Sequence, residues 1–171
     1  MLSIEKITIL SIPWDHPDSV HLRSKQQLEI DDPDYTTPPS AADVPLFLIA
    51  YHEGIPIGCG GLRPLSPSSE NARESSAEIK RMFVDSPYRV GLEGEAGLRT
   101  SVATMILEKL EEEARSRGWP WLLLETGEHM PKARRFYERC GFSQRGMFGK
   151  YVEAEGSVCY EKWVGGSASA S

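Results

Sequence analysis

Three side chains that can transfer protons lie within, or at the ends of, segments with a regular hydrophobic pattern. Glu78 begins a mostly apolar stretch, Glu125 ends another, and Tyr137 lies in a segment with helical periodicity. A carboxylate can accept a proton and a phenol can donate one, so the three could act as general base and general acid. Each also has a structural interpretation. Glu78 could pair with Lys80 at the surface, Glu125 could cap a turn at Gly127, and Tyr137 could be a packed aromatic residue.

For two further reactive side chains the sequence shows no partner residue that would make them catalytic. His129 could relay protons, but the sequence identifies no partner for it. Cys159 has no histidine near it in sequence to activate the thiol, which favours a small buried residue over a nucleophile. The four histidines lack metal-binding spacing and the three cysteines form no CxxC pair, so we expect no metal and no disulfide framework.

The hydrophobic pattern and the positions of proline and glycine predict the elements that hold these groups. Strands are expected over residues 3–12, 46–51, 55–62, 77–84, 121–124, 142–148 and 157–163, helices over 19–30, 99–117 and 131–140, and a surface loop over 31–45. This order predicts an α/β (α+β) fold with helices on both faces of a central sheet. We expect one domain over residues 1–164 and a flexible tail over 165–171.

A strand over 77–84, a glycine-containing loop over 85–98 and a long helix over 99–117 follow one another. A helix N-terminus offers unpaired N–H groups and the positive end of the helix dipole, which suit a phosphate or pyrophosphate. The same order also occurs in plain connections without a ligand, so this segment alone leaves both interpretations open.

The overall charge of the 171 residues limits the classes of partner. A net charge of −6 disfavours nucleic acid and anionic membrane surfaces and is compatible with an amine substrate. No apolar run approaches the roughly 20 residues that span a bilayer, and the N-terminus does not resemble a signal peptide. The odd number of cysteines fits a reducing compartment, so we expect a cytoplasmic location.

Several segments resemble the GNAT superfamily of N-acetyltransferases. The matching segments are EIKRMFV followed by DSPYR at 78–89 (fourth strand and turn), 105–118 (long helix), LLLETG at 122–127 (fifth strand) and 133–142, which fits the pattern A-x-x-x-Y-x-x-x-G-F of the last helix. With weaker likenesses at 48–62 and 157–162, the resemblance covers about residues 46–163. It implies a mixed central sheet splayed between strands 4 and 5, and acetyl-CoA as cosubstrate.

The resemblance also implies the residues of the site. In that family the pantetheine arm bonds to the backbone of the fourth strand, and the pyrophosphate lies on the loop before the long helix. The implied cofactor-binding residues are Met82, Phe83, Val84, Arg99, Thr100, Ser101, Val102, Ala103, Thr104, Ala133, Phe136 and Tyr137. Glu78 is implied as general base, Tyr137 as the acid that protonates the departing CoA sulfur, and Glu125 as a second candidate for base or substrate contact. Strand alternation would place Glu78 on the same face as Met82.

The predicted pyrophosphate loop departs from the family pattern Q/R-x-x-G-x-G/A. Counting back from the helix end gives residues 98–103, in which Leu98 replaces Gln or Arg and Ser101 replaces the central glycine. Counting forward from the fourth strand gives 89–94, which has better glycines but starts the helix too early. Helix length favours 98–103, where Ser101 could donate through its N–H and hydroxyl and Arg99 could reach a phosphate. Met130 stands where the family often has asparagine.

The implied activity is transfer of an acetyl group from acetyl-CoA to a primary amine of a small molecule, directly within a ternary complex. An amine of pKa about 10 needs a base or a water chain to remove its proton. A protein or peptide acetyltransferase is one alternative, and a silent module that binds acyl-CoA or a partner is another. We expect a monomer or homodimer. Trp14, Tyr35 and Tyr51 are candidates for an acceptor pocket.

Overall fold

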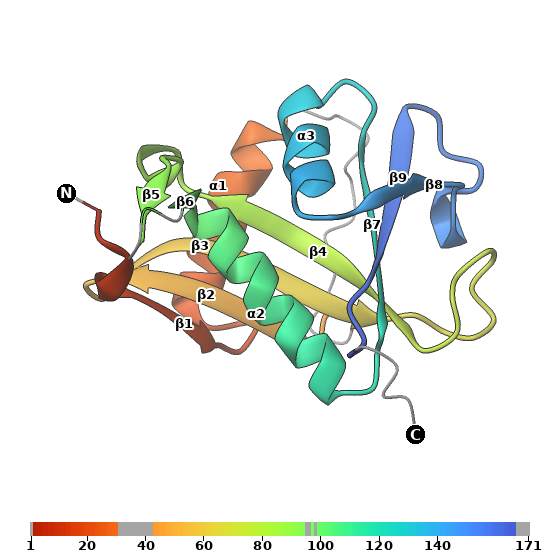
Figure 1. Cartoon of the computed structure of the whole chain (residues 1–171), viewed down its shortest axis with the longest axis horizontal. Coiled ribbons are helices and arrows are strands. Elements are labelled where there is room, and N and C mark those ends of the chain that lie inside the picture. The colour runs from red at the N-terminus through yellow and green to blue at the C-terminus, as the bar shows by residue number, and fades with distance from the viewer. Residues whose placement is uncertain (1, 31–42, 95–96, 98, 167–171) are drawn as a thin grey trace. The chain divides into compact units, whose positions relative to one another are not determined.

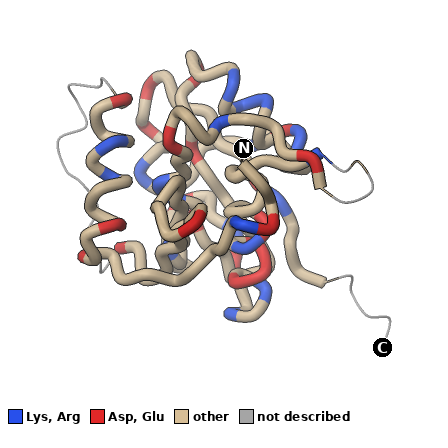
Figure 2. The backbone as a smooth tube through the Cα atoms, turned by 90° about the vertical axis from the view of Figure 1, so that its left-hand side faces the viewer, with Lys and Arg blue, Asp and Glu red and all other residues tan. Residues whose placement is uncertain are grey.

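A computed structural model of the chain describes residues 2–30, 43–94, 97 and 99–166 (Figure 1). The chain divides into two compact units, the first made of Met1–Arg63 and Lys80–Leu110 and the second of Pro64–Ile79 and Glu111–Ser171. Most of the expected loop and tail, together with Tyr35 and Leu98, lies outside the described residues. Acidic and basic residues are interspersed along the described backbone (Figure 2).

The strands confirm the predicted mixed α/β class. Seven of them form one sheet in the order β1-β2-β3-β4-β7-β9-β8, and two more form a separate pair, β5-β6. The strand β4 (Ser76–Val84) contributes its first residues to the second unit and its last residues to the first unit.

The first unit carries most of the N-terminal half of the chain. Its elements are β1 (Ile7–Ser11), α1 (Pro17–Glu29), β2 (Leu46–His52), β3 (Ile55–Pro64), the end of β4, β5 (Leu92–Glu93), β6 (Arg99–Thr100) and the start of α2 (Val102–Ser116). The strands β1, β2 and β3 pair in antiparallel fashion.

Helices cover both faces of the sheet in the first unit. Leu22 of α1 and Cys59 of β3 belong to one buried cluster. Gly58 and Gly60 flank Cys59 and therefore point to the opposite face. There Ile106 of α2 lies so close that a Cβ at either glycine would be 3.0–3.1 Å from it. The predicted arrangement of helices on two faces is thus present in this unit.

The second unit carries the remaining strands and the third helix. Its elements are the start of β4, the end of α2, β7 (Trp121–Gly127), α3 (Pro131–Arg139), β8 (Ser143–Arg145), a 3-10 turn (Gly149–Tyr151) and β9 (Ser157–Trp163). The strand β4 pairs in parallel with β7 over Ser76–Glu78 and Trp121–Leu123. The pairs β7-β9 and β8-β9 are antiparallel.

One face of the sheet in the second unit packs against helices. Lys162 of β9 donates to the carboxylate of Glu111 in α2 at 2.7 Å and to the carbonyl of Cys140 at the end of α3 at 2.8 Å. Tyr160, two residues earlier on the same face, donates to Glu138 of α3 at 2.9 Å. The residues that alternate with them in β9, Cys159 and Glu161, therefore point to the other face.

Several expected boundaries differ from the structure. The strand expected over residues 142–148 covers only Ser143–Arg145. The first strand begins at Ile7, because the residues before it form a 3-10 turn. The long helix begins at Val102 and not at Arg99, because Arg99 and Thr100 pair with β5. The fifth core strand, β7, continues to Gly127, so Glu125 lies inside it and not at its end.

Candidate active site

Glu78 is buried and bonded to a tyrosine that lies far away in sequence. Only 1% of Glu78 is exposed, and its Oε2 accepts a hydrogen bond of 2.5 Å from the phenol of Tyr151. Tyr151 ends the 3-10 turn between β8 and β9, where its ring meets Phe148 edge-on at 5.3 Å. The alternative of Glu78 as a surface carboxylate is therefore wrong.

The sheet register gathers several polar residues around Glu78. Cys159 of β9 lies opposite both Glu125 of β7 and Arg145 of β8. Leu123 lies opposite Glu78, two residues from Glu125 in the same strand. Opposed residues, and residues two apart, share a face of a sheet. Glu78, Glu125, Cys159 and Arg145 thus occupy one face of the sheet in the second unit, which we call the Glu78 face.

Glu125 is held by the neighbouring strand. The hydroxyl of Ser157 in β9 donates to Oε1 of Glu125 at 2.9 Å. Because β7 continues to Gly127, Glu125 does not cap a turn there. Its carboxylate lies on the Glu78 face, as a second acidic group there.

Cys159 lies on the same face as a buried thiol. Burial raises the pKa of this thiol, and its Sγ lies 3.5 Å from the Sδ of Met147. A neutral thiol is a poor nucleophile, so the environment agrees with the expectation that Cys159 is not the acyl carrier.

Tyr137 is enclosed by aromatic rings on α3. Its ring meets those of Phe136 and Phe142 edge-on at 5.1 and 5.7 Å, and 8% of the residue is exposed. Burial raises the pKa of its phenol well above the usual value, with smaller contributions from Cys140 and Glu125. The phenol therefore stays protonated at any ordinary pH and can donate a hydrogen bond to a developing thiolate.

Glu78 and Tyr137 belong to opposite faces of this sheet. The helix α3 packs through Glu138 on Tyr160, which points away from the Glu78 face. The other expected contributors from α3, Ala133 and Phe136, are half-buried.

The start of α2 in the first unit is capped by Ser101. The Ser101 hydroxyl accepts a hydrogen bond from the Thr104 N–H at 3.1 Å and lies 2.9 Å from the Thr104 hydroxyl. This is the usual N-cap arrangement, so the hydroxyl expected to reach a phosphate already serves the helix. The N–H groups of Val102 and Ala103, in the first turn, remain suited to an anion. A helix start at Val102 favours the 98–103 register of the loop.

The expected pantetheine strand, Met82 to Val84, lies in the first unit. Gln26 of α1 donates to the Met82 carbonyl at 3.1 Å, and Arg89 donates to the Val84 carbonyl at 2.6 Å. Just before them, Arg81 has a φ of +57°, outside the extended region. Strand alternation cannot be counted through such a residue, so the expected shared face of Glu78 and Met82 loses its basis.

Tyr151 is the residue that sequence reasoning missed. It lies in a connection predicted only as the gap between two strands, and its contact with Glu78 joins positions 73 residues apart. One signal was available: Tyr151 lies three residues after Phe148, so two aromatic side chains stand close together at the start of this gap. Within the described residues, no three His, Cys, Asp or Glu side chains gather as a metal site, and no helix is long and apolar enough to cross a bilayer.

The sequence matches the Acetyltransferase (GNAT) family over residues 8–142, and the chain belongs to this family. An IAA acetyltransferase of Azospirillum brasilense is 34% identical over 116 residues, which cover 68% of this chain and 66% of that protein. The match therefore leaves about a third of that relative uncovered.

Two solved structures bear on the fold and the cosubstrate. A protein of Klebsiella pneumoniae subsp. pneumoniae MGH 78578, described provisionally as an acyl-CoA N-acyltransferase, has a TM-score of 0.71 and 28% identity over 92% of this chain and 97% of its own. A provisional streptothricin acetyltransferase of Bacillus anthracis str. Ames has a TM-score of 0.51 and 23% identity over 69% of this chain and 61% of its own. That structure contains acetyl coenzyme A, so a structural neighbour binds the expected cosubstrate.

Proposed function

We propose that the protein transfers the acetyl group of acetyl-CoA directly to a primary amine of a small molecule. Membership of an acetyltransferase family sets the reaction class. The buried Glu78–Tyr151 pair is the observation that carries the finer proposal, because it holds a carboxylate in one orientation on the Glu78 face. Direct transfer is supported by the protonated, buried Cys159, which is poorly suited to carry an acyl group.

The proposed reaction assigns one proton transfer to each end of the amide-forming step. Glu78 accepts a proton from the acceptor amine, directly or through water, and the amine nitrogen attacks the thioester carbonyl. The tetrahedral intermediate then collapses with cleavage of the C–S bond. Tyr137 donates a hydrogen bond and then its proton to the departing thiolate, and the second proton that the amine nitrogen loses on attack returns through water to the Tyr137 phenoxide. Tyr151 acts as a positioning residue that holds Glu78 in place.

Acetyl-CoA would supply the acetyl group and a thiolate leaving group. The residues proposed to hold it are the backbone of Met82, Phe83 and Val84, the start of α2 from Arg99 to Thr104, and Ala133, Phe136 and Tyr137 of α3. The free N–H groups at the start of α2 suit its pyrophosphate. Glu125 is proposed to contact the acceptor.

One observation favours a second candidate, a silent module. The carbonyls of Met82 and Val84, which pantetheine would use, already accept hydrogen bonds from Gln26 and Arg89. If these bonds persist, the arm of the cofactor must rely on the strand N–H groups. A protein or peptide acceptor stays a further alternative within the same reaction class.

The proposal is tested by calorimetry with acetyl-CoA and by CoA release with a panel of small primary amines and a panel of peptides. We expect acetyl-CoA to bind and small amines to be acetylated in preference to peptides. Tyr137→Phe should lower kcat about 10²-fold or more, as loss of a general acid does, with little change in the Kd for acetyl-CoA. The control is Glu108→Gln, because the Glu108 carboxylate is exposed on α2. Binding without any CoA release would support the silent module, and a preference for peptides would contradict the small-molecule acceptor.

A further inference from the structure

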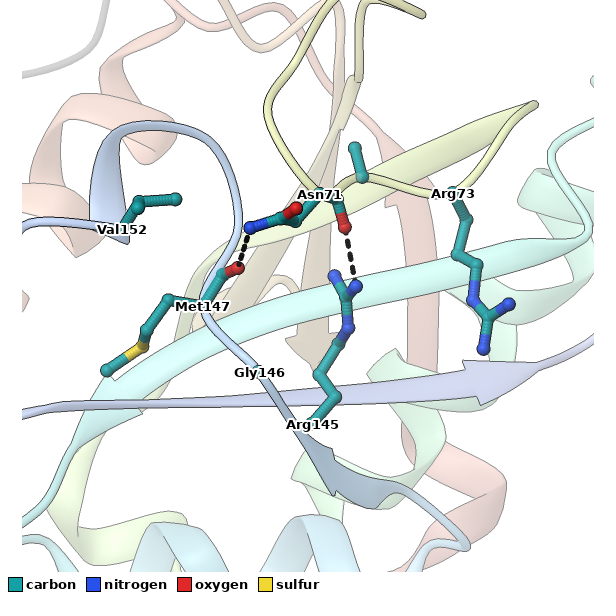
Figure 3. Close-up of a pocket in the computed structure, with 7 residues that line it drawn as sticks. Asn71, Arg73, Arg145, Gly146, Met147 and Val152 are labelled. Carbon is teal, nitrogen blue, oxygen red and sulfur yellow. Dashed lines mark hydrogen bonds between the residues drawn. The ribbon is translucent and has the colours of Figure 1, made fainter.

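A pocket of about 450 Å³ opens in the second unit between the segment before β4 and the connection that follows β8 (Figure 3). Asn71 and Arg73 line it from the first segment, Met147 and Val152 from the second, and Arg145 from the end of β8. Figure 3 shows the two arginine side chains on one side of the pocket and Met147 and Val152 on the other. The pocket therefore has a cationic wall and an apolar wall.

The charge of the cationic wall is only partly balanced. Arg73 makes two hydrogen bonds to the carboxylate of Glu161, at 2.7 and 3.1 Å, and Arg145 approaches the same carboxylate at 3.1 Å. Two guanidinium groups thus share one carboxylate, which leaves a charge of about +1 by simple count. A bound monoanion would neutralise the group, whereas a dianionic phosphate would reverse its sign.

Arg145 also holds an unused donor. Its Nη2 donates to the backbone carbonyl of Asn71 at 2.5 Å, but its buried Nη1 has no hydrogen-bond partner within the described part of the chain. A buried donor without a partner is costly, and a carboxylate oxygen is the partner that a guanidinium accepts best. Arg73 is different, because 46% of its side chain is exposed and can meet a ligand at the rim.

The apolar wall connects the pocket to the Glu78 face. Val152 directly follows Tyr151, which bonds to Glu78. Met147 contacts Cys159, whose sheet neighbour is Glu125. A ligand with its charged group at the arginines would thus lay an apolar body along the connection that also carries Tyr151.

We propose that this pocket binds the carboxylate of a small organic acid with an apolar body, and that this carboxylate belongs to the acceptor amine. The first half of the proposal concerns binding alone. The second half rests on the proposed acetyl transfer and narrows the acceptor to amines that also carry a carboxylate.

The binding half is tested by calorimetry with three probes of similar shape: phenylacetate, its neutral amide phenylacetamide, and the dianionic phenyl phosphate. We expect phenylacetate to bind at least about ten-fold more tightly than the amide, as befits a charge-assisted hydrogen bond. Phenyl phosphate should bind more weakly than phenylacetate. Equal binding of the acid and the amide, absence of phenylacetate binding, or tighter binding of the phosphate would overturn the assignment.

Matched arginine variants separate the pocket from nonspecific attraction. Arg73→Gln should weaken phenylacetate binding about ten-fold, and Arg73→Lys should weaken it less, because the charge is kept and the forked geometry is lost. The control is Arg117→Gln. Arg73 pairs with Glu161 and lies over the ring of Trp121, and Arg117 likewise pairs with Glu113 and lies over Trp119. Equal effects of the Arg73 and Arg117 variants would refute a specific pocket. Melting curves of each variant show that it is folded.

The acceptor half is tested by CoA release with para-aminomethylbenzoate and its amide. We expect the acid to have a KM at least ten-fold lower than the amide in the wild type, and this preference to disappear in Arg73→Gln. Acetylation of both amines with equal KM would overturn the acceptor half. If neither these two amines nor any amine of the panel is acetylated while phenylacetate still binds through Arg73, the proposed function fails and the carboxylate pocket stands.

Discussion

Tyr151 donates a hydrogen bond of 2.5 Å to Glu78, and at most 8% of either residue is exposed. The bond ties the connection between β8 and β9 to the start of β4. A buried carboxylate needs such a donor, because burial without hydrogen bonds is costly for a charged group. The same bond fixes the orientation of the proposed base, so one contact serves both folding and chemistry.

Removing the Tyr151 hydroxyl should therefore lower both the stability of the fold and the rate of acetyl transfer. We expect Tyr151→Phe to lower the free energy of unfolding by about 1–3 kcal/mol, because a buried charged acceptor loses this donor. It should also lower kcat about ten-fold with little change in KM for the acceptor, since a carboxylate misplaced by an ångström transfers protons less efficiently. Urea unfolding gives the free energy of unfolding, and steady-state CoA release gives kcat and KM. The control is Tyr88→Phe in the first unit. A loss of stability with an unchanged kcat would show that Tyr151 is purely structural.

Variants of Ser101, which stands where the family has a glycine, test whether the hydroxyl or only the backbone binds the pyrophosphate. Ser101→Ala should cost about 1 kcal/mol of stability, because the cap on the Thr104 N–H is lost, whereas Ser101→Gly should cost only a few tenths. If the backbone alone binds the pyrophosphate, Ser101→Gly should keep or improve the affinity for acetyl-CoA. A matching loss of affinity in both variants would instead show that the hydroxyl contacts the phosphate. Calorimetry and thermal unfolding decide between these outcomes.

The close approach of α2 to β3 depends on Gly60. A Cβ at this position would lie 2.6 Å from the Met82 sulfur, 3.0 Å from Ile106 and 3.1 Å from Leu110. We expect Gly60→Ala to destabilise the protein by about 1–3 kcal/mol through overpacking. Gly91→Ala is the matched control, because the added methyl group meets nothing within 4 Å. Equal unfolding midpoints in urea for the two variants would contradict this packing.

The buried thiol of Cys59 should make the protein less stable in alkali. Burial raises its pKa from the ordinary value near 9 to about 12, despite the opposing charges of Arg23 and Arg81. The unfolded chain therefore loses this proton first, so the stability is intact below pH 9 and falls as the pH rises towards 12. The thiol alone accounts for about 1 kcal/mol between pH 9 and pH 10.

Cys59→Ala provides the measurement for that pH dependence. Its free energy of unfolding, measured in urea under reducing conditions, should fall less steeply than that of the wild type over the same interval. Tyr51, whose pKa burial and Asp18 raise to about 12, loses stability over the same range in wild type and variant alike, so its contribution cancels in the comparison. Parallel pH curves for wild type and variant would show that Cys59 does not remain protonated.

The sequence predicted the elements well where a local signal existed. The stripe of Ile106 and Leu110 and the proline at the start of α3 both act within a few residues, and both helices are present. The start of α2 was misjudged because the pairing of Arg99 with Glu93 is a tertiary choice that helical periodicity does not contain.

The site was harder to predict, because it depends on contacts between distant segments. The buried state of Glu78 requires Tyr151, and the paired arginines Arg73 and Arg145 meet across 72 positions through Glu161. The segment before β4 and the connection after β8, which carry Arg73 and Tyr151, have no hydrophobic periodicity from which these contacts could be predicted. The sequence also could not predict that the carbonyls of Met82 and Val84 accept side-chain hydrogen bonds. Gln26 and Arg89 reach these carbonyls only in the folded chain.

The most direct test of the central claim compares wild type with Glu78→Gln for CoA release and for acetyl-CoA affinity. The substitution keeps the shape of the side chain and removes its ability to accept the amine proton. We predict a kcat/KM for the acceptor lower by about 10²-fold or more, as expected for loss of a general base, with the Kd for acetyl-CoA changed less than about two-fold. A Glu78→Gln protein that acetylates the amine at the wild-type rate would contradict the account.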